Sequence, residues 1–361
     1  MSNRRVASLT TEWIVPKTKE TRGEDCMRAR DKTPAARLAS APDQIRLFVV
    51  PIPPFRLDLT AWALRRRPQN LVDRWDGTTY RRVVPFGDVP VEMAVSQMGA
   101  SPAPRLKVCL TGARLQPEFQ REARALVEKM FGVSIDLAPF YQMANGDPKL
   151  SALVEKFRGV KPPRFPTIFE TLANAFACQQ LSLTVGLGLL SRLAAACGLS
   201  LTRGNETHYA FPRPQDLLKV SPEAFRRLGF SDKKVRAFHE LSQNIVDGRI
   251  DFDRLEKMDN QSVIDSLLEL RGVGRWTAEY VILRGLAPLH VFPGDDVGAR
   301  NRLAKWQRRK EPLNYAGVAR ATKRWQPYAG MVYFHMLLEG LSEAGALENN
   351  SRTMRKSEPA P

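Results

Sequence analysis

The spacing of apolar residues along the chain changes once, from alternation to a helical period. Between residues 45 and 112, apolar and polar positions alternate in four short runs separated by glycine and proline. Alternation places every second side chain on the same face of a strand. The pattern therefore predicts an antiparallel sheet with one buried face, formed by the runs IRLFVV, TTYRRVV, VPVEMAVSQM and RLKVCLTG.

From about residue 117 onward, apolar residues recur every three to four positions, which is typical of amphipathic helices. The first helical run, PEFQREARALVEKMFG, follows the predicted sheet directly, and further helical runs continue to about residue 345. We therefore expect an α+β N-terminal domain, an antiparallel sheet with a helix, at residues 45–135. An all-α body is expected at residues 136–346.

The two ends of the chain lack both patterns. Residues 1–44 mix charges with serine, threonine and proline, and residues 347–361 are polar and end in proline. Such segments bury too little apolar surface to offset their conformational entropy. We predict a flexible leader and a flexible tail.

Composition narrows the class of protein. The chain has 361 residues, 43% of them hydrophobic, which is enough for about two domains. Its 55 Lys and Arg against 38 Asp and Glu give a net charge of +17, which favours a polyanionic partner. No apolar stretch approaches the roughly 20 residues of a membrane-spanning helix, and the N-terminus lacks the apolar core of a signal peptide.

Cysteines and histidines give no sign of a metal or disulfide framework. The four cysteines are far apart, which argues against a zinc ribbon and against a Cys-ligated iron–sulfur cluster, and no two histidines have metal-ligand spacing. A reducing intracellular location is expected, cytoplasmic and nucleoid-associated in a bacterium. The residues are Cys26, Cys109, Cys178, Cys197, His208, His239, His290 and His335.

The run LLELRGVGRWTAEYVILRG predicts a helix-hairpin-helix at about residues 260–285. Gly272 and Gly274 suit a tight turn that exposes backbone N–H groups at a helix N-terminus, where they can bind phosphate. Arg271 and Arg275 add positive charge beside the turn. By itself this run is equally compatible with an ordinary helix connection capped by glycine.

A second motif lies twenty positions after Trp276, in the run VFPGDDVGARNRLAKW. Asp295 and Asp296 follow Pro-Gly and precede a predicted helix, within a loop at residues 292–297. A lone aspartate at this point needs no role beyond capping that helix.

Together the two motifs resemble the helix-hairpin-helix DNA glycosylase superfamily, in the branch with a Gly/Pro-rich loop and a single catalytic aspartate. Within it, the chain is similar to the bacterial-type 3-methyladenine DNA glycosylases II, alkylation-repair enzymes of broad specificity. The segment FETLANAFACQQLSLTVG resembles the family's wedge loop, and RWQPYAGMVYFHMLLEG resembles its last helices. The resemblance implies a glycosylase fold for the helical body.

The resemblance also implies that Asp296 is the catalytic carboxylate, which stabilises the oxocarbenium-like sugar as the base departs. Asp295 is the alternative within the pair. Trp276 stands where lyase-competent members carry a lysine, and an indole cannot form a Schiff base with the sugar. We therefore expect a monofunctional hydrolase.

Three aromatic residues are candidates for the base pocket. Tyr280 lies one helical turn beyond Trp276 on the same face, so both rings can line one pocket, and stacking on a cationic alkylated purine adds a cation–π attraction. The resemblance places Tyr328 opposite them, although the family often has arginine where Ala329 stands here. Ordinary core packing is the alternative for each ring.

Removing a base from a duplex requires flipping it out and filling the gap in the stack. Gln180 or Leu181 fits that wedge by position, although a simple helix-start loop capped by Ser182 is the alternative. The segment 301–325 carries eight Lys and Arg against Glu311 alone, which indicates either a phosphate-binding surface or a solvated helix face. The predicted DNA-binding residues are Gly272, Gly274, Arg275, Thr277, Gln180, Leu181, Arg308, Arg309 and Lys310.

The predicted activity is hydrolysis of the N-glycosidic bond of flipped-out alkylated purines, of the 3-methyladenine and 7-methylguanine type, by a monomer bound to damaged double-stranded DNA. The resemblance adds one metal, a Na⁺ or K⁺ ion held by the backbone carbonyls of Leu268, Leu270 and Val273, and no other cofactor. Two alternatives stay open: a glycosylase for oxidised or deaminated bases, and a non-catalytic helix-hairpin-helix DNA-binding protein.

Overall fold

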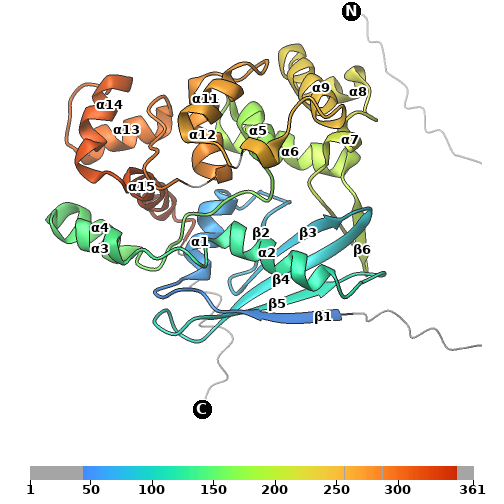
Figure 1. Cartoon of the computed structure of the whole chain (residues 1–361), viewed down its shortest axis with the longest axis horizontal. Coiled ribbons are helices and arrows are strands. Elements are labelled where there is room, and N and C mark those ends of the chain that lie inside the picture. The colour runs from blue at the N-terminus through green and yellow to red at the C-terminus, as the bar shows by residue number, and fades with distance from the viewer. Residues whose placement is uncertain (1–43, 256, 287, 348–361) are drawn as a thin grey trace, which may run out of the picture. The chain divides into compact units, whose positions relative to one another are not determined.

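The computed structural model describes residues 44–255, 257–286 and 288–347, and an antiparallel sheet comes first in the chain (Figure 1). The predicted leader and tail fall almost wholly outside these residues. The strands pair in the order β1-β5-β4-β3-β2. Their bounds are β1 Gln44–Val49, β2 Arg74–Trp75, β3 Thr79–Phe86, β4 Val89–Met98 and β5 Arg105–Thr111.

The sheet has one apolar face, as its alternating sequence predicts. In β5, Leu106, Val108 and Leu110 are buried, whereas the residues between them are exposed or half-buried. Helix α2 (Phe119–Phe131) covers the apolar face, and its buried residues form a common core with the strands. The opposite face carries charged and polar side chains such as Arg46.

Helix α1 (Leu57–Arg65) lies between β1 and β2 in the chain and packs against both α2 and the last helix, α15 (Ala329–Glu343). Seven of its residues are buried, among them Trp62. A helix buried on nearly all sides has no polar face and therefore no helical period, which explains why the sequence pattern did not predict it.

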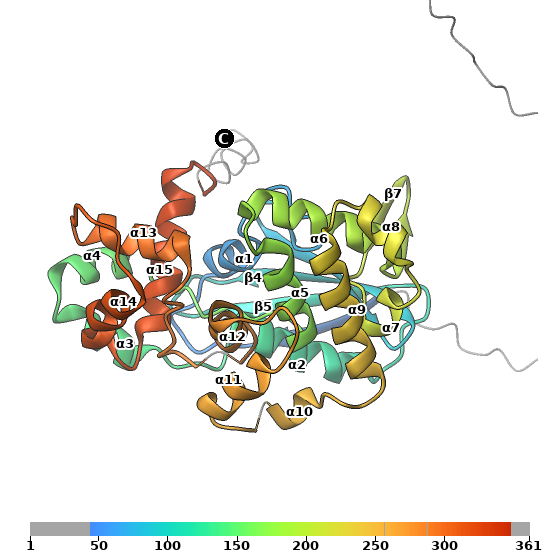
Figure 2. The same ribbon diagram turned by 90° about the horizontal axis from the view of Figure 1, so that it is seen from above.

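The rest of the described chain is mostly helical, which confirms the predicted fold class. The body is not all-α as predicted, because the strands β6 (Ser200–Arg203) and β7 (Glu206–Tyr209) pair in a small antiparallel sheet. Helix α5 is buried along almost its whole length and packs against α6, α9 and α12 (Figure 2). None of the helices in the described residues is long and apolar enough to span a membrane. The remaining elements are α3 Ala138–Asn145, α4 Pro148–Lys156, α5 Ile168–Cys178, α6 Leu183–Cys197, β6 Ser200–Arg203, β7 Glu206–Tyr209, α7 Pro214–Leu217, α8 Pro222–Arg227, α9 Asp232–Val246, α10 Phe252–Leu255, α11 Asn260–Leu268, α12 Arg275–Val281, the π-helical turn η1 Ile282–Leu286, α13 Val297–Trp306, α14 Tyr315–Thr322 and η2 Lys323–Trp325.

Buried contacts join the sheet to the helices. Arg82 of β3 makes ion pairs with Asp73 and with Glu170 of α5, and all three side chains are almost completely buried. Tyr280 of α12 belongs to the core beneath the sheet. The domain division at residues 135 and 136 stays a prediction, and residues from both sides of it share these cores.

Candidate active site

The predicted hairpin joins α11 to α12, and its two glycines serve different purposes. Gly272 has φ +82°, and a Cβ there would lie 3.2 Å from the Cβ of Ala237 on α9. The turn itself therefore requires this glycine. Gly274 has φ −108°, is exposed, and a Cβ there would meet no atom within 4 Å. The described chain gives no reason for a glycine at 274, and its predicted role in binding phosphate at the N-terminus of α12 stays a prediction.

We expect Gly274→Ala to weaken binding of undamaged duplex DNA by about tenfold, the loss of roughly one charge-assisted hydrogen bond, without lowering the melting temperature. Fluorescence anisotropy with a labelled duplex and thermal denaturation measure the two quantities. Gly272→Ala is the matched control, because its Cβ strains the turn and should lower the melting temperature. Unchanged affinity in Gly274→Ala would contradict phosphate binding at this turn.

Glu279 of α12 anchors the loop that carries the aspartate pair. Its Oε2 accepts a hydrogen bond from the Gly294 N–H at 3.0 Å, and its Oε1 accepts one from the Tyr315 hydroxyl at 2.7 Å. The Tyr315 ring packs so close to Gly294 that a Cβ there would lie 2.6 Å from ring carbon Cδ2. Burial raises the pKa of Glu279. The hairpin helix thereby fixes the position of the loop.

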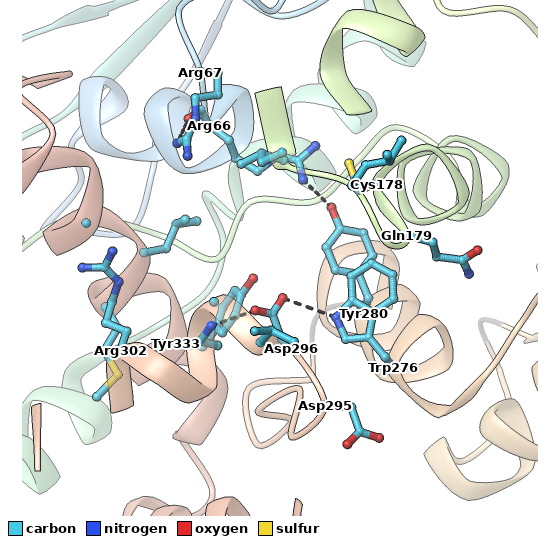
Figure 3. A pocket seen from close by; sticks show the side chains of 18 of the residues that line it. Arg66, Arg67, Cys178, Gln179, Trp276, Tyr280, Asp295, Asp296, Arg302 and Tyr333 are labelled. Carbon is cyan, nitrogen blue, oxygen red and sulfur yellow. Dashed lines mark hydrogen bonds between the residues drawn. The ribbon is translucent and has the colours of Figure 1, made fainter. Parts of the chain in front are cut away.

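Asp296 is both the N-cap of α13 and a wall of a pocket. Its Oδ1 accepts from the Ala299 N–H at 2.7 Å, and its Oδ2 accepts from Trp276 Nε1 at 3.3 Å (Figure 3). Capping, the alternative considered for this residue, therefore coexists with a position at the pocket. Asp295 lines the same pocket, but its carboxylate points away from Asp296 and the rings (Figure 3).

The pocket has a volume of about 670 Å³, within the usual range for small-molecule sites, and the α5–α6 loop, α12, the start of α13 and α15 enclose it. Trp276 and Tyr280 stack along one wall, with ring centroids 5.5 Å apart and planes 30° apart. The two rings lie together as the helical spacing predicts. Burial raises the pKa of the Tyr280 hydroxyl, which therefore stays protonated.

Tyr328 does not line this pocket, so its predicted position opposite Trp276 is corrected. It immediately precedes α15, and its ring packs on Phe140 with centroids 5.8 Å apart. The pocket face of α15 begins later, at Tyr333, and continues at the helical spacing of Met336, Leu337, Gly340 and Leu341. Burial raises the pKa of the Tyr333 hydroxyl, which also stays protonated.

The predicted wedge lies at the pocket, in the loop between α5 and α6. Gln180 is exposed and has φ +56°, a strained conformation that clusters at functional sites, and the neighbouring Leu181 side chain is 43% exposed. Lys234 holds the loop from α9, because its Nζ donates to the carbonyls of Ala177 and Gln179, each at 2.9 Å. An exposed apolar side chain on an anchored loop suits insertion into a base stack.

Gln179 ties the same loop to the hairpin. Its Nε2 donates to the Gly272 carbonyl at 2.8 Å and to Thr277 Oγ1 at 2.9 Å. Thr277 is only 1% exposed, so its side chain is not available to DNA, contrary to the prediction. Its hydroxyl anchors the wedge loop to α12.

The basic segment at 301–325 is only partly free of ion pairs. Arg302 and Lys305 pair with Glu343, and Arg324 pairs with Asp147. In the described part of the chain, Arg308, Arg309 and Lys310 are exposed and make no ion pair with a carboxylate. Their assignment to DNA phosphates stays a prediction.

Several pocket residues that the sequence reasoning did not predict come from segments far apart in the chain, among them Arg66, Arg67, Cys178, Arg302 and Tyr333. The run of three arginines at 65–67 is the signal that could have indicated the first two. No group of histidine, cysteine, aspartate or glutamate within the described ranges has the geometry of a metal site.

Three comparisons with known proteins bear on this site. A family model for HhH-GPD superfamily base excision DNA repair proteins matches residues 173–327. The chain is 27% identical over 232 residues to a DNA-3-methyladenine glycosylase of Bacillus subtilis, which covers 63% of this chain and 77% of the relative. It is 28% identical over 224 residues to DNA-3-methyladenine glycosylase 2 of Escherichia coli, covering 62% and 73%.

A solved structure of similar fold is the 3-methyladenine DNA glycosylase from Archaeoglobus fulgidus. The TM-score is 0.71 at 21% sequence identity, over 81% of this chain and 97% of that chain. The hairpin, the aspartate loop and the aromatic pocket thus define a helix-hairpin-helix DNA glycosylase. The family-model match and the two relatives confirm the resemblance, seen in the two motifs, to the HhH-GPD superfamily of base excision DNA repair proteins, and the Archaeoglobus fulgidus structure has a similar fold.

Proposed function

We propose that the protein is a monofunctional DNA glycosylase that removes alkylated purines, such as 3-methyladenine and 7-methylguanine, from double-stranded DNA. The observation that carries the proposal is the hydrogen bond between Asp296 and Trp276, which joins a carboxylate to an aromatic stack in one pocket. The relatives named DNA-3-methyladenine glycosylase support the substrate class. A cationic purine is already a good leaving group, so aromatic walls and one carboxylate suffice.

The mechanism follows from the arrangement of the site. The N–H groups at the hairpin hold phosphate, and Leu181 or Gln180 fills the gap that the flipped base leaves in the stack. The base then lies against the ring of Trp276. Asp296 stabilises the positive charge that develops on the sugar as the C1′–N bond breaks, and water attacks C1′ to leave an abasic site.

The residues around the pocket favour hydrolysis without strand cleavage. No lysine is among its lining residues within the described chain, and Lys234, near the wedge loop, is engaged with two carbonyls. A Schiff base with the sugar needs an amine, which an indole at position 276 cannot supply.

We expect the product to be an abasic site, with no strand break before alkali treatment. Denaturing electrophoresis of a labelled, methylated duplex, with and without hot alkali, measures this. A strand break without alkali, or a protein–DNA adduct trapped by borohydride, would contradict monofunctional action.

The substrate class is tested by incubating the protein with methylated duplex DNA and identifying the released bases by chromatography. The proposal predicts 3-methyladenine and 7-methylguanine. Release of only oxidised or deaminated bases would favour the alternative glycosylase, and release of no base would favour a DNA-binding protein without activity.

We also propose that the protein acts as a monomer and that a Na⁺ or K⁺ ion binds the carbonyls of Leu268, Leu270 and Val273. The Leu270 carbonyl already accepts a hydrogen bond from the Val273 N–H at 3.1 Å, and its second lone pair can still face a cation. Bound to those carbonyls, the ion would stiffen the hairpin.

A further inference from the structure

Arg66 brings a buried positive charge to the base pocket. It follows the last residue of α1 in a left-handed conformation, with φ +64°, and is 5% exposed. Its guanidinium donates to the Tyr280 hydroxyl at 2.8 Å and to Asn174 Oδ1 at 2.6 Å, and its buried Nε has no hydrogen-bond partner (Figure 3). The group thus lies beside the ring that stacks on Trp276.

A second arginine holds Arg66 in place. Arg284, in the π-helical turn η1, donates to the carbonyls of Ala63 and Leu64 in the last turn of α1. The Arg66 N–H donates to the Trp62 carbonyl at 2.8 Å, which fixes its backbone. Arg284 and α1 are more than two hundred residues apart in the chain, so this contact depends on the tertiary fold. Together with the left-handed backbone of Arg66, it directs the Arg66 side chain toward the pocket.

The charge of Arg66 has only neutral hydrogen-bond partners. Its partners are a hydroxyl, an amide and the thiol of Cys178, and it makes no direct ion pair among the residues that the structure describes, although the Asp73 carboxylate acts on it from farther away. Burying a cation without a direct ion-pair partner is costly, and an acceptor atom on a ligand would offset part of that cost. The guanidinium also lies over the Phe165 ring, 5.5 Å from its centroid, and its Nε still has no hydrogen-bond partner.

We propose that Arg66 is a specificity-determining residue that hydrogen-bonds an acceptor atom of the flipped base and stabilises the electron pair which the base takes up as it leaves. The inference rests on the proposed function, since it needs a base in this pocket. When the C1′–N bond breaks, its electron pair goes to the base. A neutral base becomes an anion, and a cationic base becomes neutral.

The effect of Arg66 therefore depends on the charge of the base. A nearby guanidinium stabilises the anion formed from a neutral base such as hypoxanthine, whose carbonyl oxygen is an acceptor. The water that attacks C1′ loses a proton, and the departing anion gains one, so the charges balance. With cationic 7-methylguanine no anion forms and the two positive charges repel in the bound state, so Arg66 contributes less.

The test compares single-turnover excision of hypoxanthine and 7-methylguanine from otherwise identical duplexes. In Arg66→Met, the hypoxanthine rate should fall by about ten- to a hundredfold more than the 7-methylguanine rate, as expected for one lost hydrogen bond to a charged group. Arg65→Met is the matched control, because Arg65 lies in the same turn and does not line the pocket. It should change both rates by the same factor.

If Arg66→Met lowers the excision rates of the two bases by the same factor, the inference is overturned. Arg66 would then only hold Tyr280 in position. Excision of 7-methylguanine but not of hypoxanthine by the wild type would also overturn it, and would leave the proposed function intact. Release of neither base would refute the proposed function itself. If Arg66→Met does not fold, Arg66→Gln, which removes the charge but keeps a polar side chain, should give the same selective loss.

Discussion

Replacing Asp296 with asparagine is expected to lower the single-turnover rate of base excision by about a thousandfold. A carboxylate about 4 Å from a developing positive charge contributes about 4 kcal/mol at an effective dielectric constant of about 20, and this energy corresponds to about three orders of magnitude in rate. The fold should survive, because an asparagine oxygen can still accept the capping hydrogen bond from Ala299. DNA affinity should be equal or higher, because one negative charge near phosphate is lost.

Asp295→Asn is the matched control for that variant. It removes the same charge one residue away, from a carboxylate turned away from the aromatic stack, and should keep most of the activity (Figure 3). A loss in Asp295→Asn with full activity in Asp296→Asn would reverse the assignment within the pair. Full activity in both variants would contradict an enzymatic role for this loop.

Glu279→Gln is expected to lower kcat by about ten- to a hundredfold, with little change in affinity for DNA. The carboxylate accepts from both the Gly294 N–H and the Tyr315 hydroxyl, whereas glutamine offers one oxygen and one donor to the same two donors. One hydrogen bond to a charged group is therefore lost, and the loop that carries Asp296 shifts. Single-turnover rates and anisotropy measure the two quantities.

The pH profile distinguishes a positioning role of Glu279 from a general loss of stability. Burial, with a contribution from the charge of Asp295, raises the pKa of Glu279, so on acidification it is protonated at a higher pH than an ordinary glutamate. A protonated carboxyl group cannot accept from both partners, so wild-type kcat should fall as the pH drops through that raised pKa. The acidic limb should be absent in Glu279→Gln. An identical profile in both proteins would rule out this role.

Tyr315→Phe separates the two contacts of Glu279. Phenylalanine keeps the ring against Gly294 and removes only the hydroxyl that donates to Glu279. The loss in kcat should be smaller than in Glu279→Gln, because the Gly294 contact remains.

Sequence patterns predicted the elements whose surroundings differ between two faces. The sheet has one apolar and one polar face, so alternation identified it. Helix α9 likewise has an apolar and a polar side. Helix α1 is buried on nearly all sides, and its period is therefore absent from the sequence.

The same contrast applies to the site. Trp276, Tyr280 and Asp296 lie within two neighbouring sequence motifs. Their spacing within these motifs was enough to predict that they line one pocket. Arg66 and Tyr333 reach the pocket only through packing between distant segments, and local spacing cannot encode that. Glu279 stands inside the hairpin motif, but its partners, Gly294 and Tyr315, are set by the tertiary fold.

Tyr328 illustrates how a family pattern can mislead in detail. The aromatic residue is present at the expected point, but it precedes the first turn of α15 and packs into the core on Phe140. Tyr333 occupies the pocket face of that helix instead. Which tyrosine reaches the pocket depends on where α15 begins and on which face of the helix each residue then lies. Sequence resemblance gives neither.

The central claim is that a flipped base enters the pocket between Trp276 and Asp296. The most direct measurement is a crystal structure of Asp296→Asn bound to a duplex that contains 7-methylguanine. The account predicts the modified base outside the helix, stacked against Trp276, with C1′ beside residue 296 and Leu181 or Gln180 in the vacated stack. A duplex bound at the hairpin with every base still stacked, and with the pocket empty, would contradict it.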